Sequence, residues 1–135
     1  MSMTIRALVF LLLVIILAAC GGDDPVPTRE AEIPPANYEP AVVEQGERNY
    51  GVFCTACHGP DATGIQGLGP SLLESNFFNS HTDEELLDFI IAGRPADHPD
   101  NTTGIAMPPR GGFPNMSDEQ ISSIIAFLRT EIAEG

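Results

Sequence analysis

The segment from Cys54 to His58 constrains this chain more than any other. Its residues are Cys-Thr-Ala-Cys-His, so two thiols lie three positions apart and a histidine directly follows the second. Each thiol can add across one vinyl group of a haem, and two intervening residues let a single tight turn reach both vinyl groups. His58 is then held below the iron as its proximal ligand. The segment therefore predicts one haem, attached covalently through Cys54 and Cys57.

Other sites built from cysteine and histidine fit this segment less well. A structural zinc site needs four ligands, usually in two paired halves, and the other candidates, Cys20, His81 and His98, are unpaired. A thioredoxin-like redox pair needs a βαβ context, whereas the flanking sequence has a helical pattern. A plain disulfide leaves the adjacent His58 without a role. Covalent haem attachment in turn requires export from the cytoplasm, for which the N-terminus provides a test.

The N-terminus has the pattern of a bacterial lipoprotein signal peptide. After Arg6, apolar residues run from Ala7 to Ala19, and this run of about 13 residues is shorter than a bilayer span. It ends in Leu-Ala-Ala-Cys, which resembles a lipobox. We therefore expect residues 1–19 to be removed and Cys20 to be lipidated, with two acyl chains giving a stable membrane anchor. The alternative is an uncleaved helical anchor with an incidental cysteine.

The rest of the chain divides into a tether and one domain. Residues 20–40 form a tether in which prolines alternate with acidic residues, a composition that favours an extended chain. Residues 41–135 form the domain, and no run of alternating polar and apolar residues in it has the length of a strand. The pattern predicts an all-α fold with long loops.

Three helices are expected in this domain. The first covers residues 41–53, where apolar residues recur at helical spacing and Gly46 permits close approach by another helix. The second and third begin with capping boxes, in which a Ser or Thr precedes a Glu or Gln by three positions. The boxes and helix ends are Thr82 with Glu85, ending at Gly93, and Ser117 with Gln120. A loop rich in glycine and proline covers residues 59–70.

The order of these elements resembles a class I cytochrome c, a small all-α fold wrapped around one covalently attached haem. The resemblance covers about 90 of the 135 residues. It implies that Gly46 packs against Phe127, an aromatic residue of the last helix. It also implies that the carbonyl group of Pro70 accepts a hydrogen bond from the proximal His58. The absence of Trp and the short domain place the chain closer to small bacterial members.

Met107 is the expected sixth ligand of the iron. It lies in a loop stiffened by Pro108 and Pro109, after the second helix, and this place also fits the family pattern. Met116 precedes the Ser117 cap, where an apolar side chain packs as a hydrophobic staple. The remaining alternatives are His98, His81 and an open site. Arg94 and Arg110 lie at the two ends of this loop, and each is a candidate for pairing with a haem propionate or, equally, an ordinary surface arginine.

The chain is strongly acidic and contains no lysine. Its formal charge is −13, and this becomes −14 when the signal peptide leaves with Arg6. Such a surface should be repelled by nucleic acids and should be steered towards basic or apolar docking surfaces of redox proteins. Part of the charge also serves solubility.

These features together predict an extracytoplasmic, membrane-tethered monohaem cytochrome c. It would carry single electrons between redox partners, with no catalytic residues of its own. A variant is a fixed haem subunit of a respiratory or photosynthetic membrane complex, such as alternative complex III or a terminal oxidase. Alternatives are a haem c enzyme or gas sensor with an open sixth iron site, and a lipoprotein without haem.

Overall fold

The computed structural model describes residues 37–135. The predicted signal peptide at 1–19, the lipidation site Cys20 and nearly all of the tether at 20–40 lie outside the described residues. No β-strand occurs within residues 37–135, so the all-α prediction is confirmed. The helices are α2 (Pro40–Phe53), α3 (Thr55–His58), α4 (Asn76–Ser80), α5 (Asp83–Ala92), the 3-10 turn η2 (Pro109–Gly112) and α6 (Asp118–Glu134).

Both predicted capping boxes are formed. The hydroxyl group of Thr82 accepts the backbone N–H of Glu85 at 3.3 Å, and the Glu85 carboxylate accepts the N–H of Thr82 at 2.8 Å. Ser117 and Gln120 make the same two bonds, at 3.2 and 2.9 Å. These bonds satisfy backbone donors that have no partner inside the helix. They fix where α5 and α6 begin.

Helices α2 and α4 differ from the prediction, and the short elements α3 and η2 were not predicted as helices. Helix α2 begins at Pro40, one residue before the expected start. Proline suits this position because it lacks the N–H that would be unpaired there. Helix α4 was not predicted, because its five residues are too few to show a helical period. The Ser75 hydroxyl group caps it by accepting the N–H of Phe78 at 3.2 Å.

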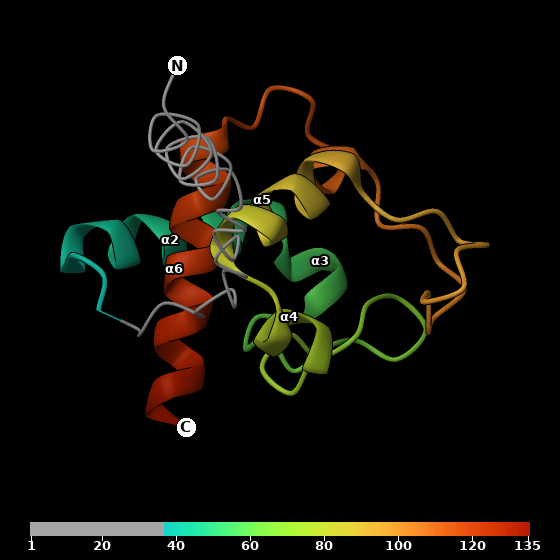
Figure 1. The fold of residues 1–135 in the computed structure, drawn as a ribbon, viewed down its shortest axis with the longest axis horizontal. Coiled ribbons are helices and arrows are strands. Elements are labelled where there is room, and N and C mark those ends of the chain that lie inside the picture. The colour runs from blue at the N-terminus through green and yellow to red at the C-terminus, as the bar shows by residue number, and fades with distance from the viewer. Residues whose placement is uncertain (1–36) are drawn as a thin grey trace, which may run out of the picture. The chain divides into compact units, whose positions relative to one another are not determined.

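Helices α2 and α6 cross near the centre of the domain (Figure 1). A Cβ atom on Gly46 would collide with the carbonyl oxygen of Ser123 and would lie 2.7 Å from Cβ of Phe127. The expected contact between Gly46 and Phe127 is therefore confirmed. Beside it, the Asn49 side-chain amide donates to the Ser123 hydroxyl oxygen at 2.9 Å, and both residues are buried. This polar pair fixes how the two helices cross.

The core lies on one side of this crossing. Helix α6 buries a stripe of apolar residues against Leu86 of α5 and Phe78 of α4. Tyr50 of α2 packs against Phe127, with the two tilted rings 5.6 Å apart between their centres. Full burial of one such side chain contributes about 1.5–3 kcal/mol to the free energy of unfolding. The stripe consists of Ile121, Ile124, Ile125 and Leu128.

A buried arginine joins α6 to α4 and α5. Only 6% of Arg129 is exposed. Its Nε atom lies 3.1 Å from a carboxylate oxygen of Asp83, and its Nη1 atom donates to the carbonyl oxygen of Phe78 at 3.1 Å. Its Nη2 atom donates to the carbonyl oxygen of His81. The charge is therefore paired and hydrogen-bonded, which makes its burial tolerable.

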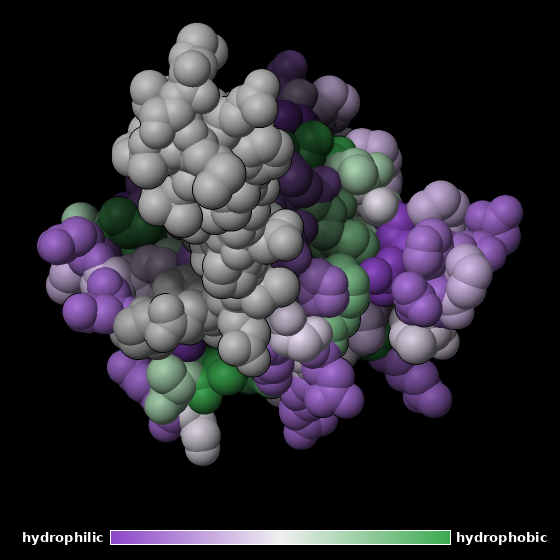
Figure 2. Space-filling model, in the orientation of Figure 1, coloured by the Kyte–Doolittle hydropathy of each residue, from purple (hydrophilic) through white to green (hydrophobic). Residues whose placement is uncertain are grey.

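None of the helices within residues 37–135 combines the length and apolar character needed to span a bilayer. On the face shown in Figure 2, apolar side chains gather over α5. The segment after α5 is mostly hydrophilic on this face.

Candidate haem-binding site

The two cysteines and His58 lie on one helical turn at the end of α2. Cys54 separates α2 from α3, with φ −117° and ψ −30°, and α3 begins directly after it. The backbone N–H groups of Cys57 and His58 both donate to the carbonyl oxygen of Cys54, at 3.2 and 3.0 Å. Cys54 is half-buried and Cys57 is exposed, and no disulfide joins them. Burial, and to a smaller degree the neighbouring Cys57, raise the pKa of the Cys54 thiol to about 12.

A backbone carbonyl group fixes the tautomer of His58. The Nδ1 atom of His58 lies 2.9 Å from the carbonyl oxygen of Pro70. Because a carbonyl oxygen only accepts hydrogen bonds, Nδ1 carries the proton and the Nε2 lone pair is left for a metal. This is the contact that the family resemblance implied for Pro70. Such a bond also raises the basicity of a ligating imidazole.

The loop 59–70 reaches the motif because it has glycine at position 69. A Cβ atom there would lie 2.6 Å from the carbonyl oxygen of Cys57 and 3.1 Å from Nδ1 of His58. Any larger residue would therefore push the loop away from the imidazole. The loop is also tied to the domain by Tyr50, whose hydroxyl group donates to the carbonyl oxygen of Gly59 at 2.6 Å.

A largely apolar cavity opens beside this turn. Both cysteines, His58, Pro70 and Met107 line it, so the structure brings together all the site residues predicted within the described chain. The walls would surround a flat apolar ring system, and the donor set supplies two thiols, an imidazole and a thioether. These residues fit a covalently attached haem. The other apolar lining residues include Phe53, Leu68, Leu72, Phe77, Phe78, Leu86, Phe89, Ile90, Ile121, Ile124 and Leu128.

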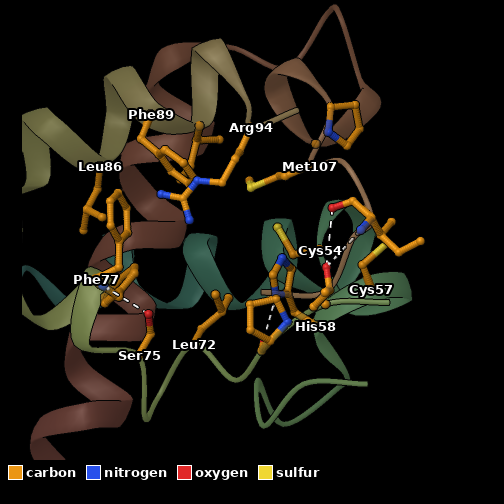
Figure 3. A pocket seen from close by; sticks show the side chains of 18 of the residues that line it. Cys54, Cys57, His58, Leu72, Ser75, Phe77, Leu86, Phe89, Arg94 and Met107 are labelled. Carbon is orange, nitrogen blue, oxygen red and sulfur yellow. Dashed lines mark hydrogen bonds between the residues drawn. The ribbon is translucent and has the colours of Figure 1, made fainter. Parts of the chain in front are cut away.

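Met107 enters the cavity from the side opposite His58 (Figure 3). Two backbone hydrogen bonds with Arg94 hold it. The N–H of Arg94 donates to the carbonyl oxygen of Met107 at 2.8 Å, and the N–H of Met107 donates back at 2.9 Å. The position of Met107 is therefore set by a fixed backbone pair at the end of α5.

The rival ligands are placed differently. Met116 is 3% exposed and belongs to the core with Ile121, as expected for a hydrophobic staple, although it also reaches the cavity wall. The His81 ring packs on the Phe77 ring, with 4.0 Å between the ring centres. Its Nδ1 atom lies 2.7 Å from the Phe77 carbonyl oxygen. His98 is exposed beside Asp100. Of the three histidines, only His58 lines the cavity.

The two arginines considered as partners of a haem propionate lie in different places. Arg110 pairs with Asp118 at 2.7 Å and donates to the carbonyl oxygen of Met116 at 2.6 Å, and it is not one of the cavity-lining residues. Arg94 lines the cavity instead. Its guanidinium group lies 4.6 Å from the ring centres of both Phe77 and Phe89.

Comparison with known proteins identifies the family. The family model described as "Cytochrome C oxidase, cbb3-type, subunit III" matches residues 41–128. This range includes Met107 and the turn that carries both cysteines and His58. The chain belongs to this family of class I-type cytochrome c domains. It is therefore a monohaem cytochrome c domain and an electron carrier, and family membership implies haem c. Cys54 and Cys57 have the spacing of its attachment motif.

Two curated relatives are similar to parts of this chain. The cbb3-type cytochrome c oxidase subunit CcoP of Rubrivivax gelatinosus is 29% identical over 70 residues, which cover 52% of this chain but only 23% of that subunit. Cytochrome c-555 of Prosthecochloris aestuarii is 28% identical over 100 residues, which cover 72% of this chain and 95% of that protein. No solved structure gives a significant match.

Sequence reasoning missed several residues that shape the site. Asn101 organises the loop before Met107: its side chain donates to the carbonyl oxygens of Pro95 and Ile105, at 3.0 and 2.8 Å, and accepts the N–H of Gly104 at 2.8 Å. Asparagine in a polar loop is a general turn signal, and its position between Pro95 and Met107 was the available clue. The aromatic pair Phe77 and Phe89 gave no sequence signal, because their segments meet only in the fold.

Proposed function

We propose that this chain is a membrane-tethered monohaem cytochrome c that passes single electrons between extracytoplasmic redox partners. His58 and Met107 are the proposed axial ligands. The observation that carries the proposal is the arrangement of these two side chains on opposite sides of an apolar cavity, with both cysteines on the turn that presents His58. The hydrogen bond between His58 and Pro70 supports it further.

The bound haem supplies one reversible electron at its iron. The chain's part is to hold two ligands in fixed positions and to keep water away. Pro70 orients the imidazole of His58, and the backbone pair with Arg94 holds Met107. Ligation by His and Met favours the ferrous state and raises the reduction potential. Ligands that stay in place in both oxidation states limit the rearrangement that accompanies each transfer.

The relatives support two forms of this function. The match spans nearly the whole of a cytochrome c-555, and this supports an independent carrier with one domain. The family description and the CcoP relative support a subunit of a terminal oxidase. Detergent extraction followed by size-exclusion chromatography separates the forms. Haem absorbance that migrates with a large complex would favour the subunit. Haem absorbance that migrates with a small particle would favour the independent carrier.

The lipid anchor at Cys20 is part of the proposal. It rests on the sequence Leu-Ala-Ala-Cys after a short apolar run. Mass spectrometry of the mature protein should find an acylated N-terminal Cys20. The Cys20→Ser variant should lose the acyl mass and leave the membrane fraction. Unmodified Cys20 in a membrane-bound protein would favour the uncleaved helical anchor.

The docking surface is proposed to be the uncharged rim of the cavity. We define the rim as the exposed residues that line the cavity, and none of them is charged. Since the rest of the chain is strongly acidic, the rim suits a partner with an apolar centre surrounded by basic residues. The rim consists of Cys57, Leu68, Pro70, Thr102, Ile105, Ala106 and Pro108.

A redox titration followed by visible absorbance tests the proposed function. One reversible single-electron transition of a covalently bound haem is the expected result. Rapid, stoichiometric binding of carbon monoxide by the reduced protein would instead indicate an open iron site and a sensor or enzyme. A purified protein without haem absorbance would contradict both.

A further inference from the structure

Arg94 differs from the other arginines of the described chain. Each of the other three pairs with a carboxylate, whereas Arg94 forms no ion pair within residues 37–135. This is unexpected in an acidic chain without lysine, where carboxylates greatly outnumber cations. The three pairs are Arg48 with Glu44, Arg110 with Asp118 and Arg129 with Asp83.

The guanidinium group of Arg94 lies on the wall of the cavity. It packs 4.6 Å from the ring centres of Phe77 and Phe89, which hold its plane by cation–π contact. One of its five N–H groups donates to the carbonyl oxygen of Asp100 at 3.2 Å. Its other N–H groups make no hydrogen bond to the described residues. In Figure 3 the guanidinium group lies beside Phe89 and points towards Phe77.

The cavity lining contains no carboxylate and no lysine, and Arg94 is its one arginine. A cation on an apolar wall carries a desolvation cost that an anion can offset, and their attraction is stronger there than in water. A planar guanidinium with unused donors binds a carboxylate through two parallel hydrogen bonds. The surroundings of Arg94 therefore fit one carboxylate group placed inside the cavity.

We propose that Arg94 receives a propionate carboxylate of the haem and thereby also holds the segment that carries Met107. The second part follows from the backbone, because Arg94 and Met107 exchange two hydrogen bonds, at 2.8 and 2.9 Å. An anion that immobilises the Arg94 side chain also immobilises this pair. Arg94 is thus a positioning residue for the proposed sixth ligand. The inference rests on the proposed function, because it requires a bound haem.

The test compares reduction potentials of the holoprotein for three variants. Arg94→Met removes the charge and keeps an apolar side chain, Arg94→Lys keeps the charge, and Arg48→Met removes an equal charge from the surface pair with Glu44. Without Arg94 the carboxylate is uncompensated and stabilises the ferric state. We expect the equilibrium constant for reduction to fall by about tenfold in Arg94→Met. It should change little in Arg94→Lys and not at all in Arg48→Met.

An equal potential in Arg94→Met and the wild type would overturn the proposal, as would an equal fall in Arg48→Met. If Arg94→Met yields no holoprotein, the infrared spectrum of Arg94→Lys tests the proposal instead. Lysine cannot make the two parallel bonds of a guanidinium, so the carboxylate bands in the redox-induced infrared difference spectrum should shift. Unchanged bands would then reject the assignment. Failure of the proposed function is distinguishable, since the wild type would then show no haem absorbance.

Discussion

The imidazole of His58 is joined to the carbonyl group of Pro70 by a hydrogen bond of 2.9 Å between residues twelve positions apart. This bond connects the turn that carries both cysteines with the end of the loop 59–70. It determines which imidazole nitrogen is left for a metal. The loop therefore contributes to the site through backbone position rather than through side-chain chemistry.

Gly69→Ala should weaken this connection. The new Cβ atom would lie 2.6 Å from the carbonyl oxygen of Cys57 and 3.1 Å from Nδ1 of His58, so the backbone must shift. We expect the free energy of unfolding of the holoprotein to fall by about 1–3 kcal/mol, measured by guanidinium denaturation. Gln66→Ala, at an exposed position in the same loop, should stay within about 0.5 kcal/mol. Equal stabilities for the two variants would contradict the proposed close approach.

Two glycines of α2 provide a matched pair for the helix crossing. Gly46→Ala should destabilise the domain by about 2–3 kcal/mol, because its Cβ atom would collide with the Ser123 carbonyl oxygen. Among residues 37–135, no atom outside the adjoining turns of α2 lies within 4 Å of a Cβ atom on Gly51. Gly51→Ala should therefore stabilise the domain by about 0.5–1 kcal/mol, the difference in helix propensity. Thermal unfolding of both holoproteins measures the contrast, and a stabilising Gly46→Ala would be inconsistent with the crossing.

Arg129→Met should lower the free energy of unfolding by about 3 kcal/mol, because it removes the cation that pairs with Asp83 and the donor to two backbone carbonyl groups. Arg48→Met is the control. Its ion pair with Glu44 has side chains that are 61% and 70% exposed, and such pairs contribute about 0–1 kcal/mol. Urea denaturation of the two variants makes the comparison. Similar losses would mean that burial of Arg129 adds nothing.

Electron exchange with small charged reagents should reveal where electrons leave the protein. A cationic ruthenium ammine complex should react faster at low salt than at high salt, and ferricyanide should show the opposite dependence, because the protein is strongly acidic. Ile105→Glu adds a charge to the uncharged rim, where Ile105 is 45% exposed. Val42→Glu adds the same charge outside the cavity lining, at a residue that is 41% exposed.

Stopped-flow rates should therefore change more for Ile105→Glu than for Val42→Glu, upwards with the cation and downwards with ferricyanide. Equal effects of the two substitutions would argue against transfer through the rim.

Local patterns predicted much of this fold. The capping boxes at Thr82 and Ser117 and the helix end at Gly93 were found because their bonds join residues that are close in sequence. The contact between Gly46 and Phe127 came from the family resemblance. These features specify where helices begin, end and cross.

The missed features depend on contacts between distant segments. Arg129 lies on the buried face of α6 and finds its partners 46 to 51 positions away, so no local pattern separates it from a surface arginine. The pairing of Arg94 with Met107 involves one residue on each side, which leaves no strand period to detect. Sequence reasoning could name both Arg94 and Arg110 as candidates, but only the fold places one of them in the cavity.

The near-infrared spectrum of the oxidised holoprotein tests the proposed ligation by His58 and Met107 most directly. A thioether bound to ferric haem gives a sulfur-to-iron charge-transfer band. We expect this band in the wild type and in Met116→Leu, and its loss in Met107→Ala. A band that survives in Met107→Ala, or that disappears in Met116→Leu, would contradict the assignment of Met107 as the sixth ligand.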